Sequence, residues 1–490
     1  MLFDKEVNVT ETVASPATPT IAHERQQFIN GEWVSGESSE LIDVVNPATE
    51  EIIAQVPAGT AGDVDRAVAA AKAAFESWSR TPVAERLRIL EAVVEGYQAR
   101  EDDLVRVISM EMGAPESFSR AAQVPLPLMT MTTAVEILRD FKFEYEANGV
   151  SIVREPIGVI GAITPWNFPL HQVALKVIPG LATGCTVVLK PSEVTPLSSI
   201  IFTEVLEAAG VPAGVFNLVQ GHGPEVGEAI SSHPDIDLVS FTGSTRAGKR
   251  VTELGAQTVK RVTLELGGKS ANIILDDADF EAAIPAGVAG SYLNCGQACN
   301  APTRMLVPRA RLAEVEELAK KAAETFEAGA ATEGKTPLGP VTTEAGLHRV
   351  RRYIEQGVEE GAKLIAGGAE PVEGPGYFVR PTVFSNVTQD MTIAREEIFG
   401  PVLSIIAYDT VDEAVAIAND SEYGLGGWVW SGDATRAREV AKRIRTGQVY
   451  INGAGIHPYA PFGGYKQSGN GREWGLYGFE EVLETKAILG

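Results

Sequence analysis

The chain has 490 residues, of which 65 are acidic and 41 basic, giving a formal net charge of −24. Because a single hydrophobic core stops growing at about 250 to 300 residues, this length predicts two or more domains. The negative charge repels phosphate backbones and anionic lipid surfaces, which argues against nucleic-acid and membrane partners and favours a soluble protein acting on small molecules.

The three cysteines, Cys185, Cys295 and Cys299, are too few for a disulfide framework in so long a chain. Their odd number indicates a reducing compartment. The sequence has no uninterrupted apolar stretch of about 18 residues, and its N-terminus lacks the basic start and apolar segment of a signal peptide. We therefore expect a cytoplasmic protein in which residues 1–24 form a flexible tail.

A hairpin and an amphipathic helix are the first elements predicted after the tail. Residues 28–34 (FINGEWV) place an Asn-Gly turn between apolar flanks, which is typical of a hairpin. From Asp63, which we expect to cap the helix, apolar residues recur every three or four positions, and such a stripe predicts a face packed on the core. The stripe consists of Val64, Val68, Ala71, Phe75 and Trp78.

Short apolar runs that begin near residues 159, 186, 215, 238 and 261 predict a series of βαβ units. Runs such as TVVLK are apolar on both sides, as expected for parallel strands that helices cover, and right-handed crossovers would order them in a doubly wound sheet. Ligands of such sheets bind at the carboxyl ends of the strands. The residues at or just past these ends are Lys190, Glu193, Thr242, Gly243 and Ser244.

A second set of α/β units begins after about residue 268. Its predicted strands contain ANIIL, RMLVP, PVLSIIAYD and GQVYINGAG, and a predicted helix runs from Val411 to Ala418. The fold class is therefore α/β, with two such domains that face each other across a cleft.

Two motifs carry the chemistry. Cys299 lies in YLNCGQACNAPTR (292–304), and Glu265 lies in LELGGKS (264–270). A thiol attacks a carbonyl well only as the thiolate, so it needs a low pKa or a nearby base, and Glu265 is the candidate base. Gly267, Gly268 and Gly296 indicate tight turns or close backbone approaches. Together the two motifs resemble the catalytic signatures of the NAD(P)-dependent aldehyde dehydrogenase superfamily, and the resemblance extends from about residue 28 to the C-terminus.

The resemblance implies the aldehyde dehydrogenase fold. Under this interpretation residues 25–140 and 158–267 form a Rossmann-like NAD-binding domain, and residues 268–473 form the catalytic domain. Residues 141–157 and 474–490 would form a small β arm that builds a homodimer or a tetramer of two dimers. The alternating run VSIVREP supports a strand in the arm but does not identify its partner.

The same resemblance implies oxidation of an aldehyde to a carboxylic acid through a thiohemiacetal and a thioester on Cys299. Asn167 and the Cys299 amide would stabilise the oxyanion, and Glu265 would activate the hydrolytic water. Lys176 and Glu473 would form a proton relay behind Glu265, although an ordinary salt bridge is the alternative interpretation of this pair.

NAD binding also depends on the resemblance, because no Gly-x-Gly-x-x-Gly follows the first strand of the series. The family uses FTGST (241–245) to open a helix whose N-terminus can hold a pyrophosphate. Glu193 would bind the adenosine ribose and repel a 2′-phosphate, so NAD is favoured over NADP. Glu397 would hold the nicotinamide ribose and Phe399 would pack near the nicotinamide ring. The implied cofactor-binding residues are Trp166, Lys190, Ser192, Glu193, Gly223, Gly227, Phe241, Thr242, Gly243, Ser244, Leu266, Gly267, Glu397 and Phe399.

The implied substrate funnel is mostly apolar and predicts a medium-sized hydrophobic or aromatic aldehyde. Its residues are Phe168, Gln172, Leu175, Ile456, His457, Tyr459 and Phe462, and His171 lies beside them. We expect no metal, because the histidines have no ligand spacing and no further ligand stands near Cys295 and Cys299. Cys185 is expected to be buried, and a reversible Cys295–Cys299 disulfide is a hypothesis that rests only on their proximity.

Three alternatives stay open at this stage. A cofactor-independent cysteine hydrolase would need only Cys299 and Glu265, but no recognisable histidine partner accompanies them. A binding protein that kept the fold without activity is possible in principle, and the retained Asn167, Glu265, Cys299 and Glu397 argue against it. A coenzyme A-acylating enzyme is the nearest competitor, and the presence of Glu265 favours hydrolysis instead.

Overall fold

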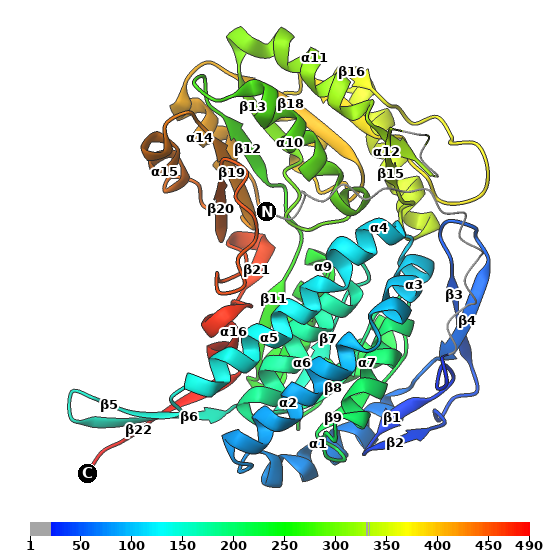
Figure 1. Cartoon of the computed structure of the whole chain (residues 1–490), viewed down its shortest axis with the longest axis vertical. Coiled ribbons are helices and arrows are strands. Elements are labelled where there is room, and N and C mark those ends of the chain that lie inside the picture. The colour runs from blue at the N-terminus through cyan, green and yellow to red at the C-terminus, as the bar shows by residue number, and fades with distance from the viewer. Residues whose placement is uncertain (1–20, 330–331, 333) are drawn as a thin grey trace.

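The computed structural model of the chain describes residues 21–329, 332 and 334–490. Two helix-covered sheets form two lobes, and a thin arm extends from the lower one (Figure 1). The predicted tail lies outside the described residues as far as residue 20. His23 already stacks on Trp33 with ring centroids 4.2 Å apart, so the described chain begins to pack before residue 25.

The first sheet contains five consecutive parallel strands, as the βαβ pattern predicted. Across the sheet they are β9 (Phe216–Leu218), β8 (Thr186–Lys190), β7 (Val159–Ile163), β10 (Leu238–Thr242) and β11 (Arg261–Glu265). The direction of winding reverses between β7 and β10, since β8 and β9 follow β7 on one side and β11 follows β10 on the other. Such a reversal opens a crevice at the carboxyl ends of the strands.

Helices cover both faces of this sheet because its strands are apolar on both faces. Val187 and Leu189 of β8 pack into a core with α2 (Val83–Gln98), α3 (Glu101–Met112), α5 (Pro125–Asp140), α6 (Pro169–Thr183) and α7 (Leu197–Ala208). Val188, between them, packs into the opposite core with α1 (Ala61–Trp78), α8 (Glu228–Ser232) and α9 (Thr245–Gly255). Alternate side chains of one strand thus anchor two helical layers.

The predicted hairpin is confirmed, with β1 (Gln27–Ile29) and β2 (Glu32–Val34) joined by Asn30 and Gly31 at positive φ. The predicted cap of α1 is wrong: Thr60 is the N-cap, and Asp63 is the third helical residue, whose carboxylate returns to the Thr60 N–H. Both belong to one capping box. The apolar stripe of α1 is buried except for Phe75, which is half-buried.

The second sheet builds the other lobe, and all four of its predicted strands are confirmed. Its order is β16 (Lys363–Ala366), β17 (Thr382–Ser385), β18 (Val402–Tyr408), β13 (Arg304–Pro308), β12 (Ala271–Ile274), β19 (Gly426–Trp430) and β20 (Gln448–Ile451). Every neighbouring pair is parallel except β16 with β17. On one face lie α10 (Phe280–Tyr292) and α11 (Leu312–Ala323), and on the other lie α12 (Glu344–Glu359), α13 (Thr392–Arg395), α14 (Val411–Asn419) and α15 (Ala434–Ala441).

The arm is a three-stranded antiparallel sheet in the order β22 (Leu483–Ile488), β6 (Val150–Pro156) and β5 (Glu144–Ala147). It projects to the lower left of Figure 1, with the C-terminus near its tip. The last strand of the arm, β22, follows β21 (Gly469–Asn470) and α16 (Gly475–Glu481) in the chain. The strand β21 pairs with β11 at the edge of the first sheet. Residues 469–470 therefore join the first sheet rather than the second.

Smaller elements complete the described chain. They are the hairpin β3 (Leu41–Val45) with β4 (Ile52–Pro57), the pair β14 (Phe326–Ala328) and β15 (Thr336–Leu338), the short helix α4 (Glu116–Phe118), and the π-helical turns η1 (Ser119–Gln123) and η2 (Gly223–Gly227). Over the residues described, the helices are too short or too polar to cross a lipid bilayer.

A buried carboxylate fastens α7 to α3. Glu111, at 0 % exposure, accepts hydrogen bonds from the main-chain N–H groups of Leu197 (2.6 Å) and Ser198 (3.1 Å). These groups open α7, whose N-cap Pro196 offers no side-chain acceptor. Burial raises the pKa of Glu111 from 4.5 to about 7, although these hydrogen bonds and the Ser198 side chain act to lower it.

We predict that this carboxyl makes the stability of the protein pH-dependent. Since its folded pKa of about 7 lies above its ordinary value of 4.5, the folded state loses part of its advantage as pH rises through this range. The variant Glu111→Gln cannot titrate at this position. The difference in thermal midpoint between this variant and the wild type should therefore shift by about 2 to 4 °C in favour of the variant when the pH is raised from 5 to 8. Equal differences at both pH values, by thermal denaturation, would contradict the prediction. Glu111→Ala, which removes both acceptors, should be less stable than wild type by about 1 to 3 kcal/mol at pH 5.

Candidate active site

The site forms where the winding of the first sheet reverses. The loop after β7 carries Trp166 and Asn167, and the turn after β10 carries Gly243 and Ser244. Glu265 ends the neighbouring strand β11. All of these residues thus lie at the carboxyl edge of the sheet, and for Gly243 and Ser244 this place was predicted from the strand ends in the sequence.

The two motifs that suggested catalysis lie in direct contact. A Cβ added at Gly268 would fall 2.3 Å from the Cys299 carbonyl oxygen, and one added at Gly267 would fall 2.3 Å from Oε2 of Glu397. Neither glycine has a positive φ. The need for glycine at these two positions is therefore explained by the close approach of neighbouring atoms and not by a turn. Gly296 has both constraints, with a φ of 71° and a Cβ position 2.0 Å from the Gly400 carbonyl oxygen.

The loop that carries Cys299 has an unusual backbone. Asn294 and Cys295 both have left-handed φ values, 54° and 58°, which cost about 1 to 3 kcal/mol each for residues with a side chain. Hydrogen bonds hold this conformation: the Asn294 amide donates to the Asn167 carbonyl (2.8 Å), and the Gln297 amide donates to the Asn294 carbonyl (3.1 Å). The Thr342 N–H in turn donates to Oε1 of Gln297 (2.9 Å).

Asn167 is fixed by the same network. Its side-chain amide donates to the Gln297 carbonyl at 2.9 Å, and its carbonyl also accepts from Nε2 of Gln123 at 3.0 Å. The side-chain amide therefore has one orientation and sits beside the nucleophile loop. Sequence reasoning missed Gln123, Asn294 and Thr342. Asn294 stands inside the cysteine motif and was within reach, whereas Gln123 lies in a π-helical turn that has no sequence signature.

Cys299 is partly exposed, and the other two cysteines are buried; all three are free thiols. Loss of hydration, followed by the charges of Glu265 and Glu397, raises the pKa of the Cys299 thiol. Burial alone raises the pKa of Cys295 to about 12. The sequence suggested that either a lowered pKa or a nearby base could produce the Cys299 thiolate. Since the pKa of this thiol is raised, the candidate base Glu265 is the route that fits the structure.

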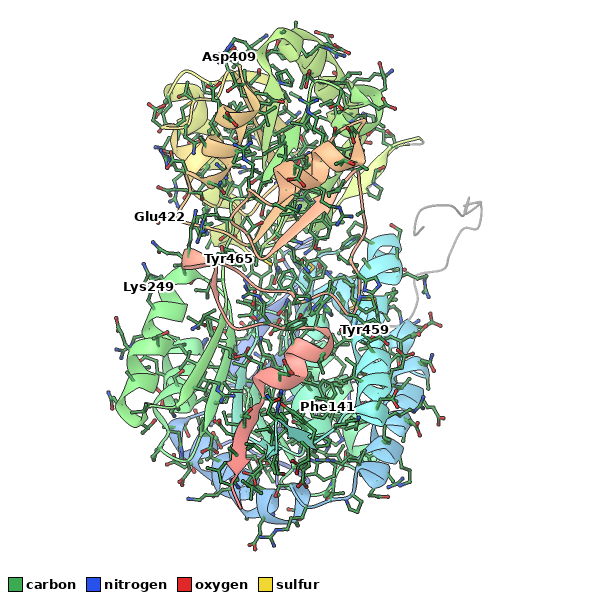
Figure 2. All side chains as sticks on the ribbon, turned by 90° about the vertical axis from the view of Figure 1, so that its left-hand side faces the viewer. Phe141, Lys249, Asp409, Glu422, Tyr459 and Tyr465 are labelled. Atoms are coloured by element: carbon green, nitrogen blue, oxygen red, sulfur yellow. The ribbon has the colours of Figure 1, made fainter. Side chains whose placement is uncertain are left out.

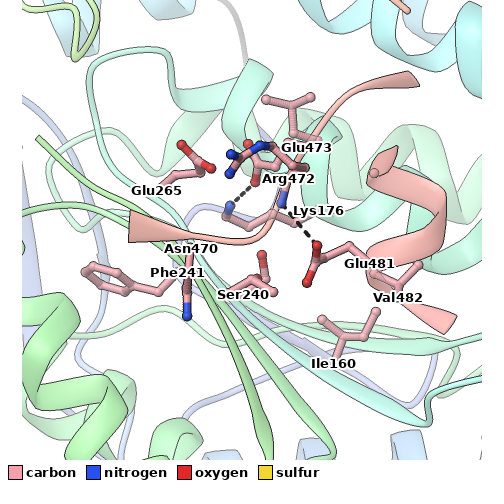
Figure 3. A pocket seen from close by; sticks show the side chains of 13 residues that line it. Ile160, Lys176, Ser240, Phe241, Glu265, Asn470, Arg472, Glu473, Glu481 and Val482 are labelled. Carbon is pink, nitrogen blue, oxygen red and sulfur yellow. Dashed lines mark hydrogen bonds and ion pairs between the residues drawn. The ribbon is translucent and has the colours of Figure 1, made fainter. Parts of the chain in front are cut away.

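Glu265 is 5 % exposed, and neither of its carboxylate oxygens has a hydrogen-bond partner in the protein. Burial first, and then the charge of Glu473, raises its pKa well above 4.5. The carboxylate lines a small cavity together with Lys176 and Glu473, which form an ion pair with 2.5 Å between Nζ and Oε1 (Figure 3). A carboxyl with a raised pKa next to a base-requiring thiol is suited to exchange protons near neutral pH.

The residues predicted to bind the adenosine end lie at the ends of β8 and β10. Lys190, at 3 % exposure, pairs with Oε2 of Glu193 at 2.7 Å. Burial raises the pKa of Glu193, but the Lys190 ammonium outweighs it, so that the pKa is lowered overall. Ser244 caps α9 by accepting from the Ala247 N–H. Open space surrounds the Cα of Gly223, and Gly227 has only one side-chain atom, at 4.0 Å.

Other implied cofactor-binding residues of the first lobe are buried. Ser192 and Thr242 are buried, and the Thr242 hydroxyl has no hydrogen-bond partner in the protein. Phe241 lies against Gly243, where a Cβ would come within 2.6 Å of the ring. Leu266 is buried against Gly248 of α9.

Glu397 and Phe399 approach the site from the second lobe. Oε1 of Glu397 accepts from the Gly268 N–H at 2.9 Å. Burial raises the pKa of Glu397, and the Gly268 hydrogen bond opposes this shift. Phe399, with a φ of 62°, meets the edge of Trp166 at a centroid distance of 5.4 Å. The second lobe thus places a carboxylate and an aromatic ring opposite the loop that follows β7.

The predicted substrate residues fall into a buried and an exposed group. Gln172, Leu175 and Phe462 are buried, and Phe168 is half-buried at the N-cap of α6. Trp474 joins them, since its ring stacks on Phe462 at 5.7 Å. The exposed group is Ile456, His457 and Tyr459, all on the loop after β20.

Figure 2 labels Tyr459 of the exposed loop. The Tyr459 hydroxyl donates to Glu136 of α5. His171 is buried against Trp474 with rings 5.5 Å apart, and burial lowers its pKa to about 3. In the chain as described, no group of three or more His, Cys, Asp or Glu side chains is placed to hold a metal ion.

Known proteins share this architecture over nearly the whole chain. A family model for the aldehyde dehydrogenase family matches residues 33–488. The 3-succinoylsemialdehyde-pyridine dehydrogenase of a Pseudomonas species is 53 % identical over 469 residues, covering 95 % of this chain and 98 % of that protein.

Solved structures agree with these sequence matches. A mutant of aldehyde dehydrogenase C from Pseudomonas syringae, in complex with NAD⁺ and octanal, has 55 % identity and a TM-score of 0.93, covering 95 % of this chain and 96 % of that one. The NAD⁺ complex of an aldehyde dehydrogenase from Bacillus cereus has 40 % identity and a TM-score of 0.91, covering 96 % of each chain. The chain belongs to the aldehyde dehydrogenase family.

Proposed function

We propose that the protein oxidises an aldehyde to a carboxylic acid with NAD, using Cys299 as the nucleophile and Glu265 as the base. The observation that carries this proposal is the contact of Gly267 and Gly268 with Glu397 and with the main chain at Cys299. It brings a thiol, a buried base and a candidate ribose-binding carboxylate together at the crevice between the two lobes.

The residues on the first sheet fit a dinucleotide. The Glu193 carboxylate at the end of β8 suits the hydroxyls of a ribose, and the N-terminus of α9 suits a pyrophosphate. The unpartnered hydroxyl of Thr242 and the open space at Gly223 are consistent with a ligand there. The related enzymes from P. syringae and B. cereus were solved with NAD⁺. When bound, NAD supplies a hydride acceptor.

The chain's own residues would then divide the chemistry. Because burial raises the pKa of the Cys299 thiol, a base has to remove its proton before the sulfur attacks the aldehyde carbon. The oxyanion of the thiohemiacetal receives hydrogen bonds from the Asn167 amide and the Cys299 N–H. After oxidation, Glu265 takes a proton from the water that hydrolyses the thioester, and the Lys176–Glu473 pair accepts it in turn.

The substrate is proposed to be a medium-sized hydrophobic or aromatic aldehyde. The buried group around Phe168, Phe462 and Trp474 is mostly apolar, with Gln172 as a polar member. His171 beside it stays uncharged near neutral pH because burial lowers its pKa to about 3. The relative solved with octanal and the relative named for a pyridine-linked semialdehyde are consistent with this class.

We predict that Cys299→Ser reduces NADH formation by more than about 10³-fold, because the hydroxyl is a far weaker nucleophile. Glu265→Gln should lower steady-state turnover by about 10²- to 10⁴-fold. It should still give one burst of NADH per site if the base acts mainly in deacylation. Stopped-flow absorbance of NADH with an aldehyde panel, with and without coenzyme A, measures both effects. Turnover that requires coenzyme A would identify an acylating enzyme, and aldehyde-independent hydrolysis without NAD would identify the cysteine hydrolase.

Cofactor choice provides a second prediction. The wild type should prefer NAD, and Glu193→Ser should raise kcat/KM for NADP by about tenfold or more by removing the repulsion of a 2′-phosphate. Glu207→Ser is the matched control, because it removes an exposed carboxylate of α7 that is hydrogen-bonded to Trp33. It should leave the ratio of kcat/KM for NADP to kcat/KM for NAD unchanged. A wild type that uses NADP as well as NAD would contradict the assigned role of Glu193.

We also propose that the arm joins subunits into a dimer or a tetramer of two dimers. Its edge strands have free main-chain groups within the described chain, and Ile488 is 52 % exposed. Removal of residues 484–490 should lower the mass measured by light scattering. Lys486→Ala, which removes only an exposed ion pair with Glu155, should not. An unchanged mass in the shortened protein would exclude this role.

A further inference from the structure

The cavity behind Glu265 extends beyond the Lys176–Glu473 pair. Its volume is about 20 Å³, enough for one water molecule. Its walls contain Ser240, Thr263 and Asn470 in addition to the charged groups. The other walls are apolar, with Ile160, Leu175, Phe241 and Val482. The polar side chains of the cavity therefore continue past the point where the proposed relay alone would end inside the protein.

Several oxygens at this cavity lack partners. Both carboxylate oxygens of Glu265 and Oε2 of Glu473 are buried and accept no hydrogen bond from the described protein. Buried carboxylates without donors are costly, and a water molecule becomes ordered where two to four polar groups surround it. The cavity is thus suited to pass protons between carboxylates through water.

The proposed relay has no outlet of its own. The side chain of Lys176 is 1 % exposed and that of Glu473 is 11 % exposed. Oxidation of an aldehyde by NAD and water yields a carboxylate, NADH and two protons, so protons must leave the site in every turnover. Because so little of the pair is exposed, a further group nearer the solvent would help to discharge these protons.

Glu481, the last residue of α16, lines the same cavity and is half-buried. In Figure 3 its carboxylate lies on the far side of the Lys176–Glu473 pair from Glu265. The Arg472 N–H donates to Oε2 of Glu481 at 3.1 Å, which fixes the carboxylate.

Charged side chains from several elements line the cavity together with Glu481. Glu265 is on β11, Lys176 on α6, and Arg472 and Glu473 follow β21. Arg261 of β11 donates to the main-chain oxygen of Glu481. Arg472 and Glu481 act in opposite directions on the pKa of Glu265, so both are electrostatically coupled to the base.

We propose that Glu481 is the outlet of the proton path that begins at Glu265. The hydrolytic water adds its oxygen to the thioester carbon, the carbon–sulfur bond breaks to return the Cys299 thiolate, and one proton of the water passes to Glu265. The other proton leaves with the carboxylic acid, which ionises in solvent. From Glu265 the proton moves through the Lys176–Glu473 pair and the cavity to Glu481, which releases it to solvent. Glu481 touches no substrate and acts through Glu265, and the inference rests on the proposed function.

The test is Glu481→Gln, which keeps an acceptor for the Arg472 N–H but cannot carry a proton. Glu480→Gln is the matched control, because the neighbouring Glu480 pairs with Arg154 at 3.1 Å and is not among the cavity-lining residues. Stopped-flow NADH traces give the burst and the steady state for both variants. A buffer series with imidazole at constant pH and ionic strength shows whether small proton carriers restore turnover.

Glu481→Gln is expected to give one NADH per site in a burst at the wild-type rate, followed by a steady state about tenfold slower, a smaller loss than that of the base itself. Imidazole should restore the steady state, and Glu481→Asp should keep most of it. A steady state equal to that of Glu480→Gln would overturn the inference, as would a loss that imidazole does not relieve. If the wild type forms no NADH with any aldehyde, the proposed function fails as well.

Discussion

The close approach of the Gly267–Gly268 main chain to Cys299 and Glu397 is the constraint on which the site depends. Two glycines without side chains let the end of the first sheet touch both the nucleophile loop and a carboxylate of the second lobe. The hydrogen bond from the Gly268 N–H to Glu397 joins the lobes at the same point. A methyl group at either position would separate groups proposed to act on one substrate, because the nearest atoms at 2.3 Å belong to the Cys299 carbonyl and to the half-buried Glu397 carboxylate.

Around this contact some polar groups are held by hydrogen bonds, and others have no hydrogen-bond partner among the described residues. Asn167, Asn294 and Gln297 form a closed hydrogen-bond network that holds a left-handed backbone before Cys299. The oxygens of Glu265, in contrast, have no protein partner. Strain and unpaired groups cluster at functional sites. Here the network fixes the loop of Cys299, the proposed nucleophile, while Glu265, the proposed base, has oxygens without protein partners that could bind water.

The five parallel strands of the first sheet and four of the seven strands of the second could be predicted, because runs such as TVVLK are apolar on both faces and turn residues separate them. The strands β16, β17 and β19 were not predicted. The strand ends also located Lys190, Glu193, Thr242, Gly243 and Ser244 at the carboxyl edge of the first sheet. The cap of α1 was placed at Asp63 rather than Thr60 because both members of a capping box are good acceptors. Gln123 and Glu481 could not be predicted, since each reaches the site through tertiary packing of a segment whose own pattern shows only a helix or turn.

The C-terminal segment links parts of the molecule that would otherwise be independent. Between residues 469 and 488 one short stretch of chain supplies the edge strand of the first sheet, then Glu473, then α16 with Glu481, and finally the outer strand of the arm. The short helix α16 alone thus separates the outer strand of the arm from the groups beside Glu265. An aldehyde dehydrogenase whose arm joined subunits as proposed would have its subunit contacts next to the proposed base, so that its specific activity would change on dilution.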